Sequence, residues 1–402
     1  MRSDDLAHDV SAQGLPDLTG LVLPRSVDGV RANALLHRVV SRQYLVRWAR
    51  ALRRLRGVGL DASGHAMAQN VLAAATVDQA LELASRPDVT AWIWRSESRH
   101  ADQHVLDRDL ANRLFGDALA LGCLEPGEAA DLLVDGLLLW PQGGRANGGD
   151  VLSDLDPESA VTCGADAQAP RLRSVATVEL PRGSRMVGCP VLLPTDSLMS
   201  DMGEVDEPVA DLDDEVALHF ASVVQDGVKV LEGTWPTGLD MISIDVRAVA
   251  PLRSYRGLRP LNYSIHGLRG LVCTSKRPDY MLAQTLVHEA THNRFSGILD
   301  CTAVVENPES THFSPFVDAI RPLGYLLHGV LSFVNDVYAA QSYLAGPQTL
   351  DPEVSKRVER YVEAKMSHLD LAFANLTSVA RPTTAGAQLL AGCDEALKVL
   401  HR

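Results

Sequence analysis

The stretch Tyr280–Phe295 reads YMLAQTLVHEATHNRF and contains an HExxH pattern that runs from His288 through Glu289 to His292. On a helix, side chains four positions apart project in nearly the same direction, about 6 Å apart along the axis. Two imidazoles at this spacing can bind one metal ion, and the intervening glutamate can act as a base or orient a ligand. The pattern therefore predicts a helix that carries a metal site.

The residues around the pattern favour the same local structure. Leu282, Leu286 and Ala290 recur every four positions and can form an apolar stripe beside the histidines. Before them, residues 270–274 (GLVCT) have the composition of a short buried strand, and residues 275–279 (SKRPD) supply a turn and a helix start. A strand that leads into a metal-binding helix suits a metalloenzyme.

Length, composition and charge limit the class of protein. The chain has 402 residues, of which 46% are hydrophobic, which is enough for roughly two or three domains with their own cores. Its net charge of -14 argues against nucleic-acid binding and against adsorption to anionic membranes. No stretch resembles a signal peptide or a membrane span, and the cysteines form no CxxC cluster. We therefore expect a cytoplasmic protein with reduced thiols.

The pattern of residues changes along the chain and predicts four regions. Residues 1–30 are expected to form an irregular arm, and residues 31–142 a helical region that begins with an arginine-rich amphipathic helix. A glycine-rich linker at 143–149 precedes an α+β catalytic region at 150–345, and helices at 346–402 close the chain. The predicted fold class is therefore α+β, predominantly helical, with one modest mixed sheet and the HExxH helix.

Periodicity also predicts individual elements. A long apolar helix is expected from Pro322 to about Tyr343, after a loop through Pro308 and Pro315. The other expected helices lie at 77–85, 107–121, 126–139, 214–230, 352–378 and 383–400. The other expected strands lie at 176–180, 185–192 and 241–249.

A third protein ligand has to come from outside the motif. The zinc-peptidase pattern HExxHxxGxxH would need glycine and histidine where this chain has Phe295 and Ile298, and Glu306 and Glu309 lie in a proline-containing loop. His328, in the long apolar helix, is the better candidate. Its spacing leaves two interpretations open, a metal ligand or a buried histidine that is hydrogen-bonded to a neighbour.

The start of that apolar helix suggests a binding site for an anion. Pro322 suits the first helical position, which would place Arg321 at the helix N-terminus and about 10 Å from His328 along the axis. This gap fits a small dicarboxylate that chelates the metal at one end and meets a guanidinium at the other.

The segment 270–345 resembles the HExxH-type peptide β-hydroxylases of ribosomal peptide maturation. The resembling pieces are LVHEATHN from Leu286, FSPF from Phe313, RPL from Arg321 and LHGV from Leu327, in that order. The resemblance implies iron(II) as the metal, 2-oxoglutarate and dioxygen as cosubstrates, and hydroxylation of a β-carbon in a ribosomally made precursor peptide. Some members carry a radical S-adenosylmethionine domain, but this chain has no cysteine cluster for one, so we expect a stand-alone enzyme.

An iron(II) oxygenase needs three facial protein ligands and open positions for the 2-oxoacid and dioxygen. We assign His288, His292 and His328 as these ligands. Two alternatives to His328 stay open. Asp318 is one, and His312 is the other, because it stands where the resemblance leads us to expect an aromatic residue.

Three further residues receive roles on this interpretation. Arg321 would bind the distal carboxylate of 2-oxoglutarate, and Ser314 could assist the cosubstrate, although a Ser-Pro pair is also a common turn. Glu289 would orient a ligand or a water. Two rival hypotheses remain, a zinc metallopeptidase in which Glu289 activates a metal-bound water, and a peptide-binding protein without catalysis. The peptide, the hydroxylated residue, the leader-binding surface and the oligomeric state are left open.

Overall fold

The structure is a computed structural model of the chain. It describes residues 15–56, 63–97, 137–141, 171–175, 177–179, 185–187, 214–252, 262–275, 279–347 and 350–402, and the single positions Leu110, Leu114, Ala118 and Cys123. The predictions for residues 126–136 and 143–149, and most of the helix expected at 107–121, lie outside the described residues.

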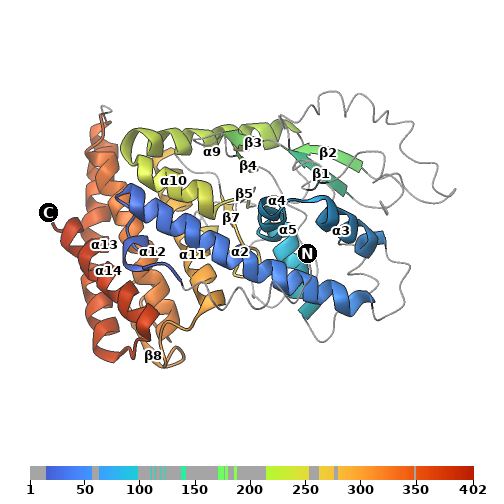
Figure 1. Ribbon diagram of the computed structural model, residues 1–402. Coiled ribbons are helices and arrows are strands. Elements are labelled where there is room, and N and C mark those ends of the chain that lie inside the picture. Colours follow the sequence, from blue (N-terminus) through green and yellow to red (C-terminus); the bar gives the residue numbers. More distant parts are fainter. Residues whose placement is uncertain are drawn as a thin grey trace.

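The described part of the chain is mostly helical (Figure 1). Its helical elements are η1 (Thr19–Leu21), α2 (Val27–Arg56), α3 (Ser63–Ala74), α4 (Val77–Ala84), α5 (Pro87–Glu97), α9 (Asp214–Thr234), α10 (Pro236–Asp245), α11 (Asp279–Cys301), α12 (Leu323–Leu344), α13 (Pro352–Val379) and α14 (Thr384–Leu400). Figure 1 shows α12, α13 and α14 gathered at one end of the molecule and α3, α4 and α5 toward the other, with α2 running between them.

Short strands accompany the helices. The largest sheet has the order β3-β4-β5-β7-β6 and mixes parallel and antiparallel pairs. Its strands are β3 (Thr177–Glu179), β4 (Arg185–Val187), β5 (Ala248–Pro251), β6 (Asn262–Tyr263) and β7 (Leu271–Thr274). The two smaller sheets pair β1 (Leu137–Pro141) with β2 (Arg171–Val175), and β8 (Thr311–Ser314) with β9 (Ala319–Pro322). The predicted fold class is confirmed: the protein is α+β, mostly helical, with a small mixed sheet.

The HExxH helix α11 is the central element and packs against α2, α9, α10 and α12. The predicted apolar stripe is buried, because Leu282, Leu286 and Ala290 are each at most 1% exposed and pack against α9. Further along the same helix, Phe295 and Ile298 belong to a second core that also contains residues of α2 and α12. The helix that carries the motif is therefore fixed by two cores at once.

The N-terminal and C-terminal helices share that second core. The apolar face predicted for the arginine-rich helix is buried, as Val40, Tyr44 and Trp48 show, and it joins Val334 of α12 and Leu369 of α13 in one cluster. The four sequence regions therefore contribute to common packing, and their boundaries as domains stay a prediction.

One boundary of the predicted arm is wrong, because helix α2 begins at Val27, inside the residues 1–30 expected to be irregular. The hydroxyl oxygen of Ser26 accepts a hydrogen bond from the backbone N–H of Gly29 at 3.3 Å. A serine at this position caps a helix start by satisfying one of its free N–H groups.

Three other local predictions are wrong. Residues 241–245 belong to helix α10 and not to a strand, because a short apolar run fits a buried helical turn as well as a strand. Residues 137–139 lie in β1, where we expected the end of a helix. The loop expected after α11 contains the β8–β9 hairpin, in which Asp318 adopts a positive φ of 51°, a conformation that acidic residues tolerate in turns.

The long apolar helix and the two closing helices are confirmed as α12, α13 and α14. Among the helices of the described ranges, none is both long and apolar enough to cross a membrane.

Candidate metal centre

The strand β7 and the helix α11 hold the motif in place. Asn293, one turn after Glu289, donates from Nδ2 to the carbonyl of Leu271 and accepts from the backbone N–H of Gly270, both at 3.3 Å. Gly270 has φ +79°, in the left-handed region that favours glycine. The start of the buried strand is thus tied to the helix beside the metal-binding residues.

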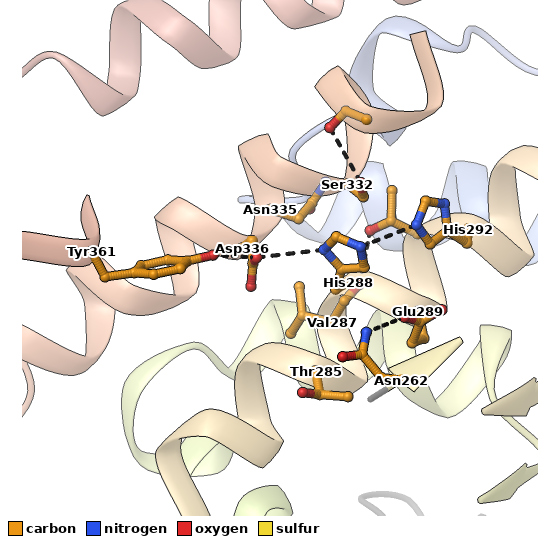
Figure 2. A network of polar contacts seen from close by, with 12 residues as sticks. Asn262, Thr285, Val287, His288, Glu289, His292, Ser332, Asn335, Asp336 and Tyr361 are labelled. Atoms are coloured by element: carbon orange, nitrogen blue, oxygen red, sulfur yellow. Dashed lines mark hydrogen bonds and ion pairs between the residues drawn. The ribbon is translucent and has the colours of Figure 1, made fainter. Parts of the chain in front are cut away.

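The two motif histidines face each other. Their Nε2 atoms are 3.1 Å apart, and the rings meet edge to face with centroids 4.7 Å apart (Figure 2). The ligand atoms of His288, Glu289 and His292 all lie within 4.8 Å of one another. These three residues form a cluster that could hold a metal ion, as the HExxH spacing predicts.

The ring of His288 is held from behind by a carboxylate. Its Nδ1 lies 3.4 Å from Oδ2 of Asp336 on α12, and the hydroxyl of Tyr361 on α13 donates to the same oxygen at 2.5 Å (Figure 2). Burial lowers the pKa of His288, but Asp336 and then Glu289 outweigh it and the pKa is raised. A carboxylate that accepts from Nδ1 directs the lone pair of Nε2 toward a metal.

Neither Asp336 nor Tyr361 was identified in the sequence. A signal for Asp336 was present, because it is the only carboxylate in helix α12, whose residues are mostly apolar. A single carboxylate on such a helix is buried only when it has a partner. Tyr361 lies among exposed residues of α13 and has no comparable signal.

Glu289 is buried, with 1% of its surface exposed. The side-chain amide of Asn262, on β6, donates to its Oε1, whereas Oε2 has no hydrogen-bond partner among the described residues. An unpaired buried carboxylate oxygen is costly. A cation or a bound water in the cluster would satisfy it, so the donor set fits a metal.

His328 lies beside the motif. Its ring stacks on His292, with centroids 4.4 Å apart and an angle of 22°, and it also contacts Phe295 at 4.5 Å. Burial, with smaller contributions from His266 and His288, lowers the pKa of His328 to about 3, so the ring is neutral. The structure therefore brings the third predicted imidazole next to the pair, although its ligand atoms are not part of the cluster described above.

Arg321 is placed differently from the expectation. Helix α12 begins at Leu323 with Pro322 as its N-cap, so Arg321 lies in strand β9, where it pairs with His312 of β8. The helical spacing assumed between Arg321 and His328 therefore does not apply. The side chain of Arg321 is exposed.

The remaining predicted residues also lie on the hairpin. Ser314 is buried in β8, His312 lies 3.1 Å from the hydroxyl of Ser310, and Asp318 is exposed in the turn. Among the described residues, none of them belongs to the cluster that could hold a metal.

A cavity of about 420 Å³ lies beside the site. One side is formed by His288, Asp336 and Asn262, the last of which holds Glu289. Another is formed by α13, which contributes Arg357 and Lys365. Its volume is in the range of small-molecule sites, roughly 300–1,000 Å³.

A scan against models of known protein families finds no match to this chain, and no curated protein matches it. The geometry of the site is therefore the basis for an assignment of function.

Proposed function

We propose that the protein is an iron(II)- and 2-oxoglutarate-dependent oxygenase that hydroxylates a β-carbon of a residue in a ribosomally made precursor peptide. The observation that carries the proposal is the position of the HExxH cluster beside a cavity of small-molecule size with cationic side chains in its wall. A dicarboxylate cosubstrate needs a pocket of this kind, in which a cation meets the carboxylate that does not bind the metal.

The residues present can supply the protein side of such a centre. His288 and His292 would bind the metal through the two Nε2 atoms that face each other. His328 is the proposed third ligand because its ring lies against His292. Three protein ligands would leave positions on a bound iron(II) open for a 2-oxoacid and dioxygen. The bound iron would supply activation of dioxygen, coupled to oxidative decarboxylation of 2-oxoglutarate to succinate and carbon dioxide.

The other side chains would position these groups. Asp336 holds the tautomer of His288 that leaves Nε2 free, and Asn262 holds the Glu289 carboxylate toward the cluster. Phe295 packs against His328, and Phe333 lies 5.0 Å from the ring of His288. These ring contacts hold the two imidazoles in place.

The second candidate function is a zinc metallopeptidase. The observation in its favour is the free Oε2 of Glu289 within the cluster, which could take a proton from a metal-bound water.

Anaerobic reconstitution separates the two functions. The protein is loaded with iron(II), supplied with 2-oxoglutarate and a library of precursor-type peptides, and then exposed to air. Succinate that forms only with iron(II) and dioxygen, together with a peptide heavier by one oxygen atom, supports the oxygenase. Peptide cleavage without succinate, in a protein that purifies with zinc, would establish the peptidase.

A further inference from the structure

We infer that the cavity beside His288 binds the distal carboxylate of a small dicarboxylate, and that Lys365 and Arg357 of α13 bind this carboxylate in place of Arg321. The inference rests on the proposed function, since it identifies where the cosubstrate's second carboxylate lies.

Lys365 is a cation of α13 that lies against two aromatic rings. Its side chain is half-buried, and its Nζ lies 4.3 Å from the centroid of the Phe333 ring and 6.0 Å from that of Tyr361. It forms no ion pair with any described residue. The nearby carboxylate of Asp336 already binds His288 and Tyr361. An ammonium stacked on aromatic rings and lacking a carboxylate is a ready site for an anion.

Burial is consistent with that interpretation. It lowers the pKa of Lys365, and Asp336 opposes the shift without cancelling it. A bound carboxylate in the cavity would stabilise the charged form of the ammonium.

Arg357 extends the same face of α13. Positions 357, 361 and 365 are each one helical turn apart, so their side chains project in similar directions, and all three line the cavity. Arg357 forms no ion pair within the described part of the chain. A guanidinium and an ammonium on one face can hold a carboxylate between them, with the guanidinium supplying two parallel N–H donors.

The cavity reaches the metal cluster at His288, which lines it together with Phe333 and Asp336. Lys365 contacts Phe333, and Phe333 contacts His288, so the ammonium is only two ring contacts from the imidazole. On this inference one carboxylate of the ligand lies at α13, and the rest of the molecule extends past Phe333 toward His288. Arg321 lies on the exposed hairpin and does not line this cavity.

Two further donors in the cavity wall lack partners. The amide nitrogen of Gln284 and the hydroxyl of Tyr280 are buried there without a hydrogen-bond acceptor among the described residues. Buried donors are normally satisfied. A ligand rich in oxygen acceptors, reached through a small side-chain rotation, would satisfy them, and a dicarboxylate is such a ligand.

The test compares two 2-oxoacids on the full-length protein loaded anaerobically with iron(II). They are 2-oxoglutarate and 2-oxopentanoate, which has a methyl group in place of the distal carboxylate. Loss of a charged hydrogen bond weakens binding about tenfold or more. Lys365→Met should therefore raise the Kd of 2-oxoglutarate about tenfold and leave that of 2-oxopentanoate unchanged. Lys365→Arg should restore most of the preference for 2-oxoglutarate over 2-oxopentanoate, and Arg357→Gln should weaken this preference.

Matched controls lie on the same helix and on the hairpin. Lys356→Met removes an exposed lysine of α13 that does not line the cavity, and it should leave both Kd values unchanged. Arg321→Ala should do the same. The inference is overturned if Arg321→Ala raises the Kd of 2-oxoglutarate and Lys365→Met does not. It is also overturned if Lys365→Met weakens only the peptide, because the cavity would then take an acidic side chain of the substrate.

Failure of the proposed function can be told apart from failure of the inference. If the wild-type protein forms no succinate under any condition, the oxygenase proposal fails. Glutarate then decides the inference, because its binding needs no turnover. Binding of glutarate that Lys365→Met weakens about tenfold supports the cavity as a carboxylate site, and a wild-type protein that does not bind glutarate refutes it.

Discussion

Two half-buried histidine clusters in this protein differ in what surrounds the ring nitrogens. In the first, which we term the arginine cluster, His37 of α2 lies between Arg247 and Arg269: Nε2 is 3.3 Å from one guanidinium and Nδ1 is 3.0 Å from the other. In the metal cluster, the Nε2 atoms of His288 and His292 are 3.1 Å apart and face each other. The arginine cluster has its cations built in, whereas the metal cluster presents ring nitrogens to one another.

The difference indicates which cluster needs a ligand. Burial lowers the pKa of His37, and Arg247 and Arg269 lower it further, so the ring is neutral and can accept from a guanidinium. Burial also lowers the pKa of His292, with His288 and His328 adding to the effect. The described residues place no guanidinium against His292, so a metal ion is the natural partner for its lone pair.

The largest effect is expected from His292→Ala, which removes one nitrogen of the facing pair. A metal ligand contributes several kcal/mol to binding, so affinity for iron(II) or zinc should fall about 100-fold or more. Competition with a coloured chelator measures this. His401→Ala is the control, because His401 is exposed and pairs with Asp370 at 2.9 Å; its metal affinity should equal that of the wild type. Equal affinity in His292→Ala would remove the distinction between the two clusters.

A smaller decrease in metal affinity is expected from Asp336→Asn. The variant keeps the shape of the side chain but loses the charge that holds Nδ1 of His288. Changes to such supporting partners typically cost about 10- to 100-fold in metal affinity. Tyr361→Phe, which removes only the hydrogen bond to Asp336, should cost less. An Asp336→Asn protein with wild-type affinity would mean that Asp336 serves only to pack α12 against α13.

A substitution in the arginine cluster should lower the free energy of unfolding and leave the metal affinity unchanged. Glu82 lies 3.2 Å from Nε of Arg247 and 3.3 Å from Nη2 of Arg86. Glu82→Gln removes this charge, and because the side chain is partly exposed we expect a loss of about 1.5 kcal/mol in the free energy of unfolding. Urea unfolding in the presence of a chelator measures it. A drop in metal affinity, or no change in stability, would contradict the assignment of this cluster to structure.

The sequence predicts the metal cluster better than its surroundings, for a physical reason. His288 and His292 share a helix, so their proximity follows from helical geometry alone. The three closing helices were predicted for the same reason, since their periodicity is local. Asn262, Tyr361 and Lys365 reach the site from other elements, and no local pattern encodes such contacts.

Arg321 shows that a helix can be predicted correctly while a residue at its end is placed wrongly. The apolar helix was predicted within a residue of its bounds, but Pro322 is the N-cap and not the first helical residue, so Arg321 lies in strand β9 and not at the helix N-terminus. Strands β8 and β9 were not predicted because each has only four residues, with a proline directly after β8 and another at the end of β9. So short a segment carries little periodicity.

The smallest expected effect is a change in pH dependence, from His37→Gln. In the unfolded chain a histidine titrates near pH 6.5, and the pKa of His37 in the folded protein lies well below its ordinary value. Below about pH 6.5 the unfolded chain therefore binds more protons, and the stability contributed by His37 is lost as the pH falls toward its folded pKa. It is fully present above about pH 6.5.

A glutamine in place of His37 cannot bind a proton. As the pH falls, the free energy of unfolding of the variant should therefore decrease less steeply than that of the wild type, by up to about 1.4 kcal/mol per pH unit. Urea unfolding between about pH 5 and 7 measures the slope of the unfolding free energy against pH for both proteins. His292 and His328 also have lowered pKa values, but they are present in both proteins and cancel in the difference. Parallel slopes would show that burial and the neighbouring arginines do not hold His37 neutral. Added metal should leave the difference unchanged, because the cationic guanidiniums of Arg247 and Arg269 lie against the two ring nitrogens and would repel a metal ion.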